Sequence, residues 1–150
     1  MGRQQAGVGD SENRVRILIV DDHPVVRRGL AELIGQESDL VVTGEAENAQ
    51  QALESVGKQQ FDLAIIDISL SGTNGVELTE KVKSEYPDLP VLILTMHEEL
   101  VYAERAFRAG ARGYVTKHEA AETVITAIRL VINGHKYISR RINRLRATKL

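Results

Sequence analysis

The sequence predicts an α/β fold, a doubly wound parallel sheet of five strands with helices on both faces. Two observations predict it. Short apolar segments alternate along the chain with longer segments whose apolar residues recur every three or four positions. The short segments are apolar at nearly every position, which is typical of strands covered on both faces. A strand-helix order repeated five times implies parallel strands joined by right-handed crossovers.

The five strands follow from length and β-branched content. Each candidate segment is short, apolar and bounded by polar or turn-forming residues. We expect strands at Val15–Val20, Leu40–Thr43, Leu63–Ile66, Val91–Leu94 and Gly113–Thr116.

The five helices follow from apolar stripes at helical spacing, which let each helix bury one face. Pro24 stands where a first helical turn tolerates proline, and Gly110 follows a helical pattern as a stop signal. Pro87 and Pro90 end the third helix before the fourth strand. The stripes are Val25, Leu30, Leu33 and Ile34; Ala49, Ala52, Leu53 and Val56; Val76, Leu78, Thr79 and Val82; Leu100, Ala103, Ala106 and Phe107; and Val124, Ile125, Ile128 and Val131.

Length and composition favour one domain in a reducing compartment. A chain of 150 residues fits one domain with short extensions. The absence of cysteine excludes disulfides, thiolate nucleophiles and cysteine-based metal sites, and no apolar run approaches the ~20 residues of a membrane-spanning helix. We expect a disordered leader at residues 1–14 (Met1–Arg14), the folded domain at 15–134 and a basic linker at 135–150.

The charge is unevenly distributed. Five basic residues and no acidic one lie between Ile138 and Leu150. Without them, 14 of the 19 basic residues remain against 21 acidic ones, so the body carries −7. An acidic body repels nucleic-acid phosphates and can hold a divalent cation. We interpret the basic end as a solvated linker, with contact to nucleic acid or an acidic partner as the alternative.

The candidate site lies where the strands end, because ligands of open α/β sheets bind outside the carboxyl ends of the strands. Each residue has an ordinary structural explanation on its own, such as a helix cap, a turn, a strand-end hydroxyl or a surface lysine. Their coincidence at one rim favours a site. They are Asp21 and Asp22 after the first strand, Asp67 after the third, Thr95 after the fourth and Lys117 after the fifth.

The residue types indicate phosphoryl transfer. Three neighbouring carboxylates repel one another unless a cation compensates, and carboxylate oxygens suit Mg²⁺. Lys117 offers a positive charge and Thr95 a hydroxyl to phosphoryl oxygens. A carboxylate nucleophile beside a metal and a lysine is arranged to form an aspartyl phosphate.

Four segments then resemble a known family, the CheY-like receiver domain of two-component response regulators. They are Val15–Asp22 (VRILIVDD), Asp62–Gly75 (DLAIIDISLSGTNG), Leu92–Thr95 (LILT) and Gly113–Lys117 (GYVTK), and the resemblance covers roughly Val15 to Asn133. It implies a flavodoxin-like (βα)5 sheet with strand order 2-1-3-4-5. It also implies a phosphoacceptor at Asp67 and a Mg²⁺ site formed by Asp21, Asp22, Asp67 and the backbone carbonyl of Ser69.

The resemblance also implies a switch. Thr95 would bond a phosphoryl oxygen and move toward it, Lys117 would pair with another, and Tyr114 occupies the aromatic switch position. Phosphorylation would then alter the surface formed by the fourth helix, the fifth strand and the fifth helix. Gly75 matches the turn glycine of the family.

Two positions depart from the family pattern. Ser71 replaces the usual proline four residues after Asp67, and we expect it to loosen that loop. His118 replaces a frequent cis-proline after Lys117. A cis bond without proline costs about 3–4 kcal/mol, so the conformation of this peptide is left open.

Finer sequence features resemble the NarL/FixJ subfamily, which carries a LuxR-type helix-turn-helix after the receiver. These features are Asp21–Pro24 (DDHP) with Arg27, Thr95–Glu98 (TMHE) and Arg108–Tyr114 (RAGARGY). We favour a chain shortened before its output domain, because Gly134–Ser139 (GHKYIS) resembles the run into that linker. A stand-alone receiver, acting in a phosphorelay or by protein contact, is the alternative.

The histidines His23, His97, His118 and His135 lack mutual ligand spacing, and we interpret them as non-metal positions. We expect His97, two residues after Thr95, to control the access of water to an aspartyl phosphate.

The implied partners are a sensor histidine kinase, a second copy in a homodimer, and DNA only through an output domain; a membrane is not expected, and the implied location is the cytoplasm. Three other functions compete with this interpretation. A haloacid dehalogenase-type phosphatase needs a second aspartate two residues after the nucleophile, where His23 and Pro24 stand. A dinucleotide-binding domain needs a Gly-x-Gly-x-x-Gly run that the first turn lacks. A receiver working by contacts alone, unphosphorylated, is disfavoured by the complete set of site residues. The interpretation is therefore a signalling domain that catalyses only its own aspartyl phosphorylation and dephosphorylation.

Overall fold

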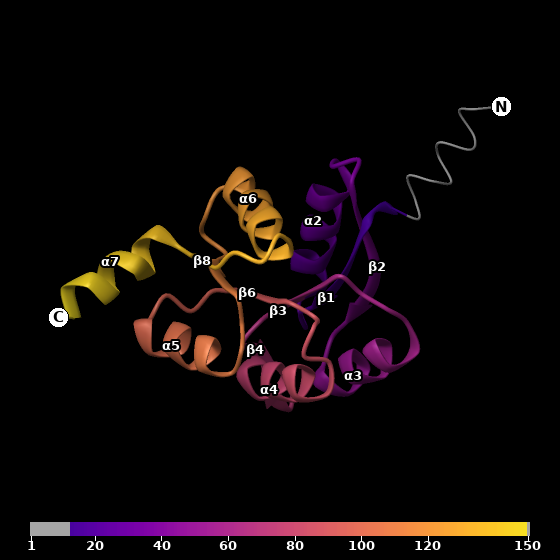
Figure 1. Ribbon diagram of the computed structural model, residues 1–150, viewed down its shortest axis with the longest axis horizontal. Coiled ribbons are helices and arrows are strands. Elements are labelled where there is room, and N and C mark those ends of the chain that lie inside the picture. Colours follow the sequence, from indigo (N-terminus) through magenta and orange to yellow (C-terminus); the bar gives the residue numbers. More distant parts are fainter. Residues whose placement is uncertain (1–12, 150) are drawn as a thin grey trace.

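A computed structural model describes the backbone of residues 13–149. The expected leader lies outside the described residues except for its last two positions. A central parallel sheet separates two layers of helices (Figure 1). The elements are β1 (Val15–Val20), α2 (Pro24–Gly35), β2 (Leu40–Ala46), α3 (Ala49–Lys58), β3 (Leu63–Ile66), β4 (Ser69–Leu70), β5 (Thr73–Asn74), α4 (Gly75–Glu85), β6 (Val91–Thr95), α5 (Leu100–Arg108), β7 (Gly113–Thr116), α6 (Ala121–Ile132), β8 (Tyr137–Ile138) and α7 (Arg140–Lys149).

The main sheet has the order β2-β1-β3-β6-β7-β8, and all its pairings are parallel. The five expected strands are therefore confirmed in the expected order 2-1-3-4-5. Three of them have the expected bounds, and β2 runs on to Ala46 after a register shift opposite Ile17 and Leu18. The small hairpin β4-β5 lies apart from this sheet and begins two residues after Asp67.

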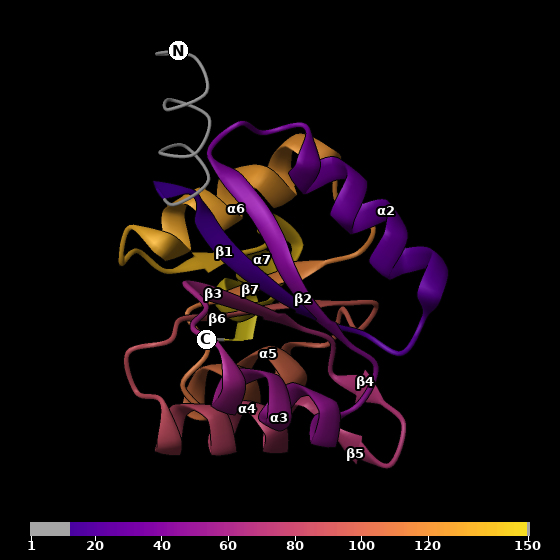
Figure 2. The ribbon, with the colours of Figure 1, turned by 90° about the vertical axis from the view of Figure 1, so that its right-hand side faces the viewer.

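Two apolar cores lie on opposite faces of the sheet. Helices α2 and α6 cover one face, and α3, α4 and α5 cover the other (Figure 2). Alternate residues of one strand supply both cores: in β1, Ile17 and Ile19 face the first layer, while Leu18 and Val20 face the second. This alternation explains why the central strands are apolar at nearly every position.

Local signals set the helix ends. Asn48 and Asn74 accept hydrogen bonds from the first turns of α3 and α4, and Pro24 opens α2. Gly110, with a φ of 108°, takes a left-handed conformation just after α5. Within the part of the chain that the structure describes, no helix is both long and apolar enough to cross a membrane.

The segment expected to be a basic linker contains a sixth strand and a helix. The backbone N–H groups of Tyr137 and Ser139 donate to carbonyls beside the outer edge of β7, at 3.0 and 2.9 Å. Ser139 and Ile142 are fully buried, and Ile142 belongs to the core under α5. The sequence did not predict this contact, because a single isoleucine among basic residues does not form the apolar stripe that indicates a buried helix.

Candidate functional site

The five residues expected at the rim all lie at the carboxyl ends of neighbouring parallel strands. Asp21 and Asp22 follow β1, Asp67 follows β3, Thr95 ends β6, and Lys117 follows β7. Asp21, Asp67 and Thr95 are buried, with at most 4% of their surface exposed. Because these strands are parallel, their carboxyl ends lie at the same edge of the sheet, and the polar residues that follow them come close together.

Lys117 joins two of the carboxylates. Its Nζ lies 2.7 Å from Asp21 Oδ2 and 2.9 Å from Asp67 Oδ2. Burial alone would lower the pKa of Lys117, but its hydrogen bonds to Asp21 and Asp67 outweigh burial and raise the pKa. The ammonium therefore stays charged and offsets part of the repulsion between the two buried carboxylates.

Asp22 is the more accessible carboxylate of the pair. Its Oδ2 accepts a hydrogen bond from Ser71 Oγ at 3.0 Å. The sequence indicated a loosened loop after Asp67. In the structure this loop is held in place, because Ser71 is hydrogen-bonded to Asp22 and the loop forms the hairpin β4-β5.

The backbone around Asp67 is closely packed. The Ser69 N–H donates to Asp67 Oδ1 at 3.2 Å, and the Gly75 N–H donates to the Ile68 carbonyl at 2.7 Å. A Cβ at Gly75 would lie 2.1 Å from the Asp67 carbonyl oxygen, a clash that only glycine avoids. Gly75 therefore permits α4 to start directly against the strand end that carries Asp67.

A chain of contacts leads from the site to the outer strands. Thr95 Oγ1 accepts the His97 N–H at 3.4 Å, and the Tyr114 hydroxyl donates to the His97 carbonyl at 2.8 Å. Tyr114 is fully buried, and this burial, together with the nearby charges of Glu99 and Asp67, raises the pKa of its hydroxyl. His97 Nε2 lies 2.8 Å from Ser69 Oγ, so His97 contacts both the Asp67 loop and the Tyr114 hydroxyl.

The acidic cluster has a donor set that fits a divalent cation. Ligand atoms of Asp21, Asp22, His23 and Asp67 all lie within 4.8 Å of one another. Asp22 Oδ1 is buried without a hydrogen bond; His23 Nδ1 lies 3.0 Å away, close enough for an ion pair, but not at hydrogen-bond geometry. A buried carboxylate oxygen without a donor is unfavourable unless a cation faces it, and oxygen ligands suit Mg²⁺.

Two residues at the site had no assigned role in the sequence interpretation. His23 lies 3.0 Å from Asp21 Oδ1, and Arg27 donates to the Asp21 carbonyl while its Nε lies 3.4 Å from Glu45. The signal for His23 was its position directly after Asp22. Arg27 could have been found from helical geometry, because four residues after His23 it faces back toward the start of α2.

The Lys117–His118 peptide, left open by the sequence, is trans, since no cis bond occurs in the part of the chain described. His118 lies outside the cluster, with its Nε2 3.8 Å from Glu98.

Comparison with known proteins gives one consistent result. Residues 17–129 match the family model of the response regulator receiver domain. The transcriptional regulatory protein DegU of Brevibacillus brevis is 34% identical over 128 residues, covering 85% of this chain and 54% of DegU. A LuxR-family two-component response regulator from Aurantimonas sp. SI85-9A1 is 34% identical with a TM-score of 0.88, covering 91% of this chain and 97% of that one.

A third match is an isolated receiver. The REC domain of RcsB from Salmonella enterica serovar Typhimurium, solved with the phosphomimetic BeF₃⁻, has a TM-score of 0.83 and is 26% identical, covering 89% of this chain and 99% of that one. The chain spans 54% to 63% of the length of the curated relatives it matches. The expected similarity to LuxR-type regulators is therefore confirmed.

Proposed function

The chain belongs to the response regulator receiver domain family, and we propose that it accepts a phosphoryl group on Asp67 from a sensor histidine kinase. One observation carries this proposal: the buried Asp67 carboxylate lies against Lys117 and beside two further carboxylates at the rim of the sheet. The Asp67 carboxylate oxygen would form the new P–O bond as the P–N bond of the kinase phosphohistidine breaks.

The neighbouring residues have distinct roles in this proposal. Lys117, already 2.9 Å from Asp67, neutralises charge on a phosphoryl oxygen. The Thr95 hydroxyl donates to another phosphoryl oxygen. A movement of Thr95 would reach Tyr114 through His97, whose N–H donates to Thr95 and whose carbonyl accepts from the Tyr114 hydroxyl. Asp67, Thr95 and Lys117 are thus the catalytic residues, and Thr95 and Tyr114 the switch.

Mg²⁺ is the proposed cofactor. Asp21, Asp22, Asp67 and the backbone carbonyl of Ser69 would hold it, since the acidic cluster supplies the oxygen ligands that Mg²⁺ prefers. The ion would neutralise charge as the phosphoryl group is transferred. His23 is outside this ligand set, because a nitrogen ligand suits Mg²⁺ less well than oxygen does.

The proposed output is control of transcription in the cytoplasm. Relatives of this chain include a transcriptional regulatory protein, and the chain covers only part of its length. We propose that the receiver controls a DNA-binding output domain, that DNA contact is made there, and that phosphorylation favours a homodimer. A stand-alone receiver acting in a phosphorelay or through protein contacts is the second candidate, and the buried charge pairs around Asp67 favour phosphorylation over contacts alone.

Intact mass after incubation with Mg²⁺ and acetyl phosphate tests the proposal. The chain as it stands should gain one phosphoryl group, and Asp67→Asn should gain none. Asp88→Asn is the matched control, because Asp88 is an exposed aspartate outside the cluster. EDTA should prevent the adduct.

Two results together would contradict the proposal: the unmodified chain gains no phosphoryl group, and it does not bind beryllofluoride. The second result is needed because beryllofluoride, unlike an aspartyl phosphate, is not lost by hydrolysis. That pair of results would favour a receiver that works by contacts alone. Persistence of the adduct in Asp67→Asn would instead move the acceptor to another residue.

A further inference from the structure

The outer edge of β7 is covered by the chain itself. The strand β8 pairs with β7, and α7 packs beside α5 and extends beyond the body of the fold (Figure 1). The C-terminal segment Tyr137–Lys149 therefore occupies the edge between α5 and α6, the surface expected to change on phosphorylation. We call this segment the C-terminal latch.

Three contacts join the latch to the residues that link the site to this edge. The Ser139 N–H donates to the Tyr114 carbonyl at 2.9 Å. Ile142 is fully buried in the same core cluster as Tyr114, Ala103 and Ala106. Arg141 Nε lies 3.3 Å from Glu98 Oε1, in the loop that continues from Thr95.

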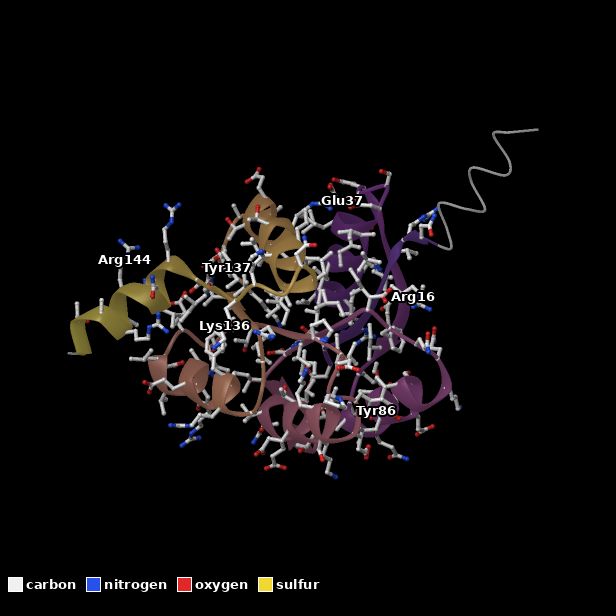
Figure 3. All side chains as sticks on the ribbon, viewed as in Figure 1. Arg16, Glu37, Tyr86, Lys136, Tyr137 and Arg144 are labelled. Atoms are coloured by element: carbon white, nitrogen blue, oxygen red, sulfur yellow. The ribbon has the colours of Figure 1, made fainter. Side chains whose placement is uncertain are left out.

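The helix of the latch is held by one apolar side chain. Ile142 is the only buried side chain of α7 between residues 140 and 148, and the other described side chains of the helix are exposed. A groove of about 550 Å³ separates α5 from the latch, with Phe107 and Ile138 in its lining. Figure 3 shows Lys136 and Tyr137 beside the start of α7 and Arg144 further along the helix. The position of α7 on the domain therefore depends mainly on the burial of this one side chain.

We infer that the latch is the element that this receiver switches: it is closed over the α5–β7 edge when Asp67 is unmodified and released when Asp67 is phosphorylated. Thr95, His97 and Glu98 lie in one continuous segment, so a shift of Thr95 toward a phosphoryl group would change the position of Glu98 relative to Arg141. The same shift disturbs the hydrogen bond between Tyr114 and the His97 carbonyl. It thereby disturbs the packing of Ile142, which lies in the same core cluster as Tyr114. This inference rests on the proposed phosphorylation of Asp67.

Distance measurement between two spin labels tests it. The chain has no cysteine, so Glu54→Cys on α3 and Ala147→Cys on α7 introduce the two labels, both at exposed positions. The unmodified site should give one narrow distance distribution. Mg²⁺ with beryllofluoride should broaden or shift it, and the same addition should have no effect in Asp67→Asn.

Variants test the latch without any phosphorylation. Arg141→Gln and Glu98→Gln should broaden the distribution of the unmodified protein, and Ile142→Ala should broaden it further. Arg144→Gln is the matched control, because Arg144 is an exposed arginine of the same helix that has no ion pair among the described residues. Coupling is reciprocal, so Arg141→Gln should tighten beryllofluoride binding about two- to fivefold, a range set by the small energy of an exposed ion pair.

The outcomes separate the two proposals. A phosphoryl adduct on Asp67 without any change in the distance distribution would overturn the latch and leave the proposed function intact. An absent adduct would overturn the proposed function and, with it, release by phosphorylation. Distributions unchanged in Arg141→Gln, Glu98→Gln and Ile142→Ala would overturn the closed latch in either case.

Discussion

Two residues, Gly75 and Lys117, determine the geometry and the charge balance around Asp67. Gly75 has no Cβ, and this allows α4 to begin against the Asp67 carbonyl. Lys117 has a single charged atom that reaches both Asp21 and Asp67, so it balances two carboxylates at once. At the opposite end of the sheet, the side chain and the backbone N–H of Arg16 both donate hydrogen bonds to the Asp62 carboxylate.

Gly75→Ala should destabilise the fold. The added Cβ would lie 2.1 Å from a backbone oxygen, which cannot rotate away, so the backbone must shift. The expected cost is about 1–3 kcal/mol of unfolding free energy, measured by urea denaturation. Gly29→Ala is the matched control, because Gly29 lies exposed inside α2 and an added methyl group there would have no atom within 4 Å. This control should gain up to about 1 kcal/mol. Equal stability of the two variants would contradict the close approach.

The Asp62–Arg16 pair should contribute stability only above acidic pH. Burial pushes the pKa of Asp62 upward, but hydrogen bonds from the Arg16 side chain and N–H outweigh it, so the pKa falls below its ordinary value of 3.8. A carboxyl with a lowered folded-state pKa stabilises the fold above its unfolded pKa, and this contribution is lost as pH falls through the folded value.

Asp62→Asn should therefore reduce the unfolding free energy near pH 7 by about 1 kcal/mol. The difference from the unmodified chain should shrink as pH falls below 3.8. Denaturation at pH 7 and at pH 3 measures it, with Glu80→Gln, an exposed carboxylate of α4, as the control. A difference that is independent of pH would show that the carboxylate charge is not the source.

At the scale of elements, the C-terminal segment belongs to the packing of the domain. Parallel β-α units bury both faces of a sheet but leave its outer strands with unpaired backbone groups. On the β7 side, β8 pairs with that edge, and Ile142 fills a position in the core beside α5. The folded part of the chain therefore extends beyond residue 134.

A chain ending at Gly134 should be less stable than the full chain. It loses the pairing of β8 and the burial of Ile142, and removal of a buried isoleucine side chain alone costs about 2–5 kcal/mol. Urea denaturation gives the unfolding free energy of both chains. Removal of Thr148 to Leu150 instead is the control, and it should have little effect. If the chain ending at Gly134 were as stable as the full chain, the boundary expected from the sequence would be correct.

At the scale of the whole molecule, the site exists only because the sheet brings distant segments together. Asp21 and Lys117 are 96 positions apart in the sequence, yet their side chains are 2.7 Å apart in the fold. The fold also concentrates negative charge, since three carboxylates meet at one rim and one lysine compensates for only part of it. A bound cation should therefore stabilise the whole domain.

Mg²⁺ should raise the unfolding free energy of the intact chain. At a concentration ten times its Kd, an ion that binds only the folded state contributes about 1.4 kcal/mol. Asp22→Asn should lose most of this increment, while Glu32→Gln, an exposed carboxylate on α2 outside the cluster, should keep it. Denaturation with and without Mg²⁺ measures the difference, and an equal increment in both variants would place the ion elsewhere.

The sequence by itself determined the five strands and the rim where Asp21, Asp22, Asp67, Thr95 and Lys117 meet, while the strand order was implied by the resemblance to receiver domains. It could do so because apolar periodicity reports burial, and because parallel strands end on the same side of a sheet.

Only the tertiary structure decided the sixth strand, the burial of Ile142, the position of His97 between Ser69 and Tyr114, and the bond from Ser71 to Asp22. Each of these depends on a few contacts between segments far apart in the chain. So few contacts leave no periodic pattern, and the local sequence around these residues therefore does not predict them.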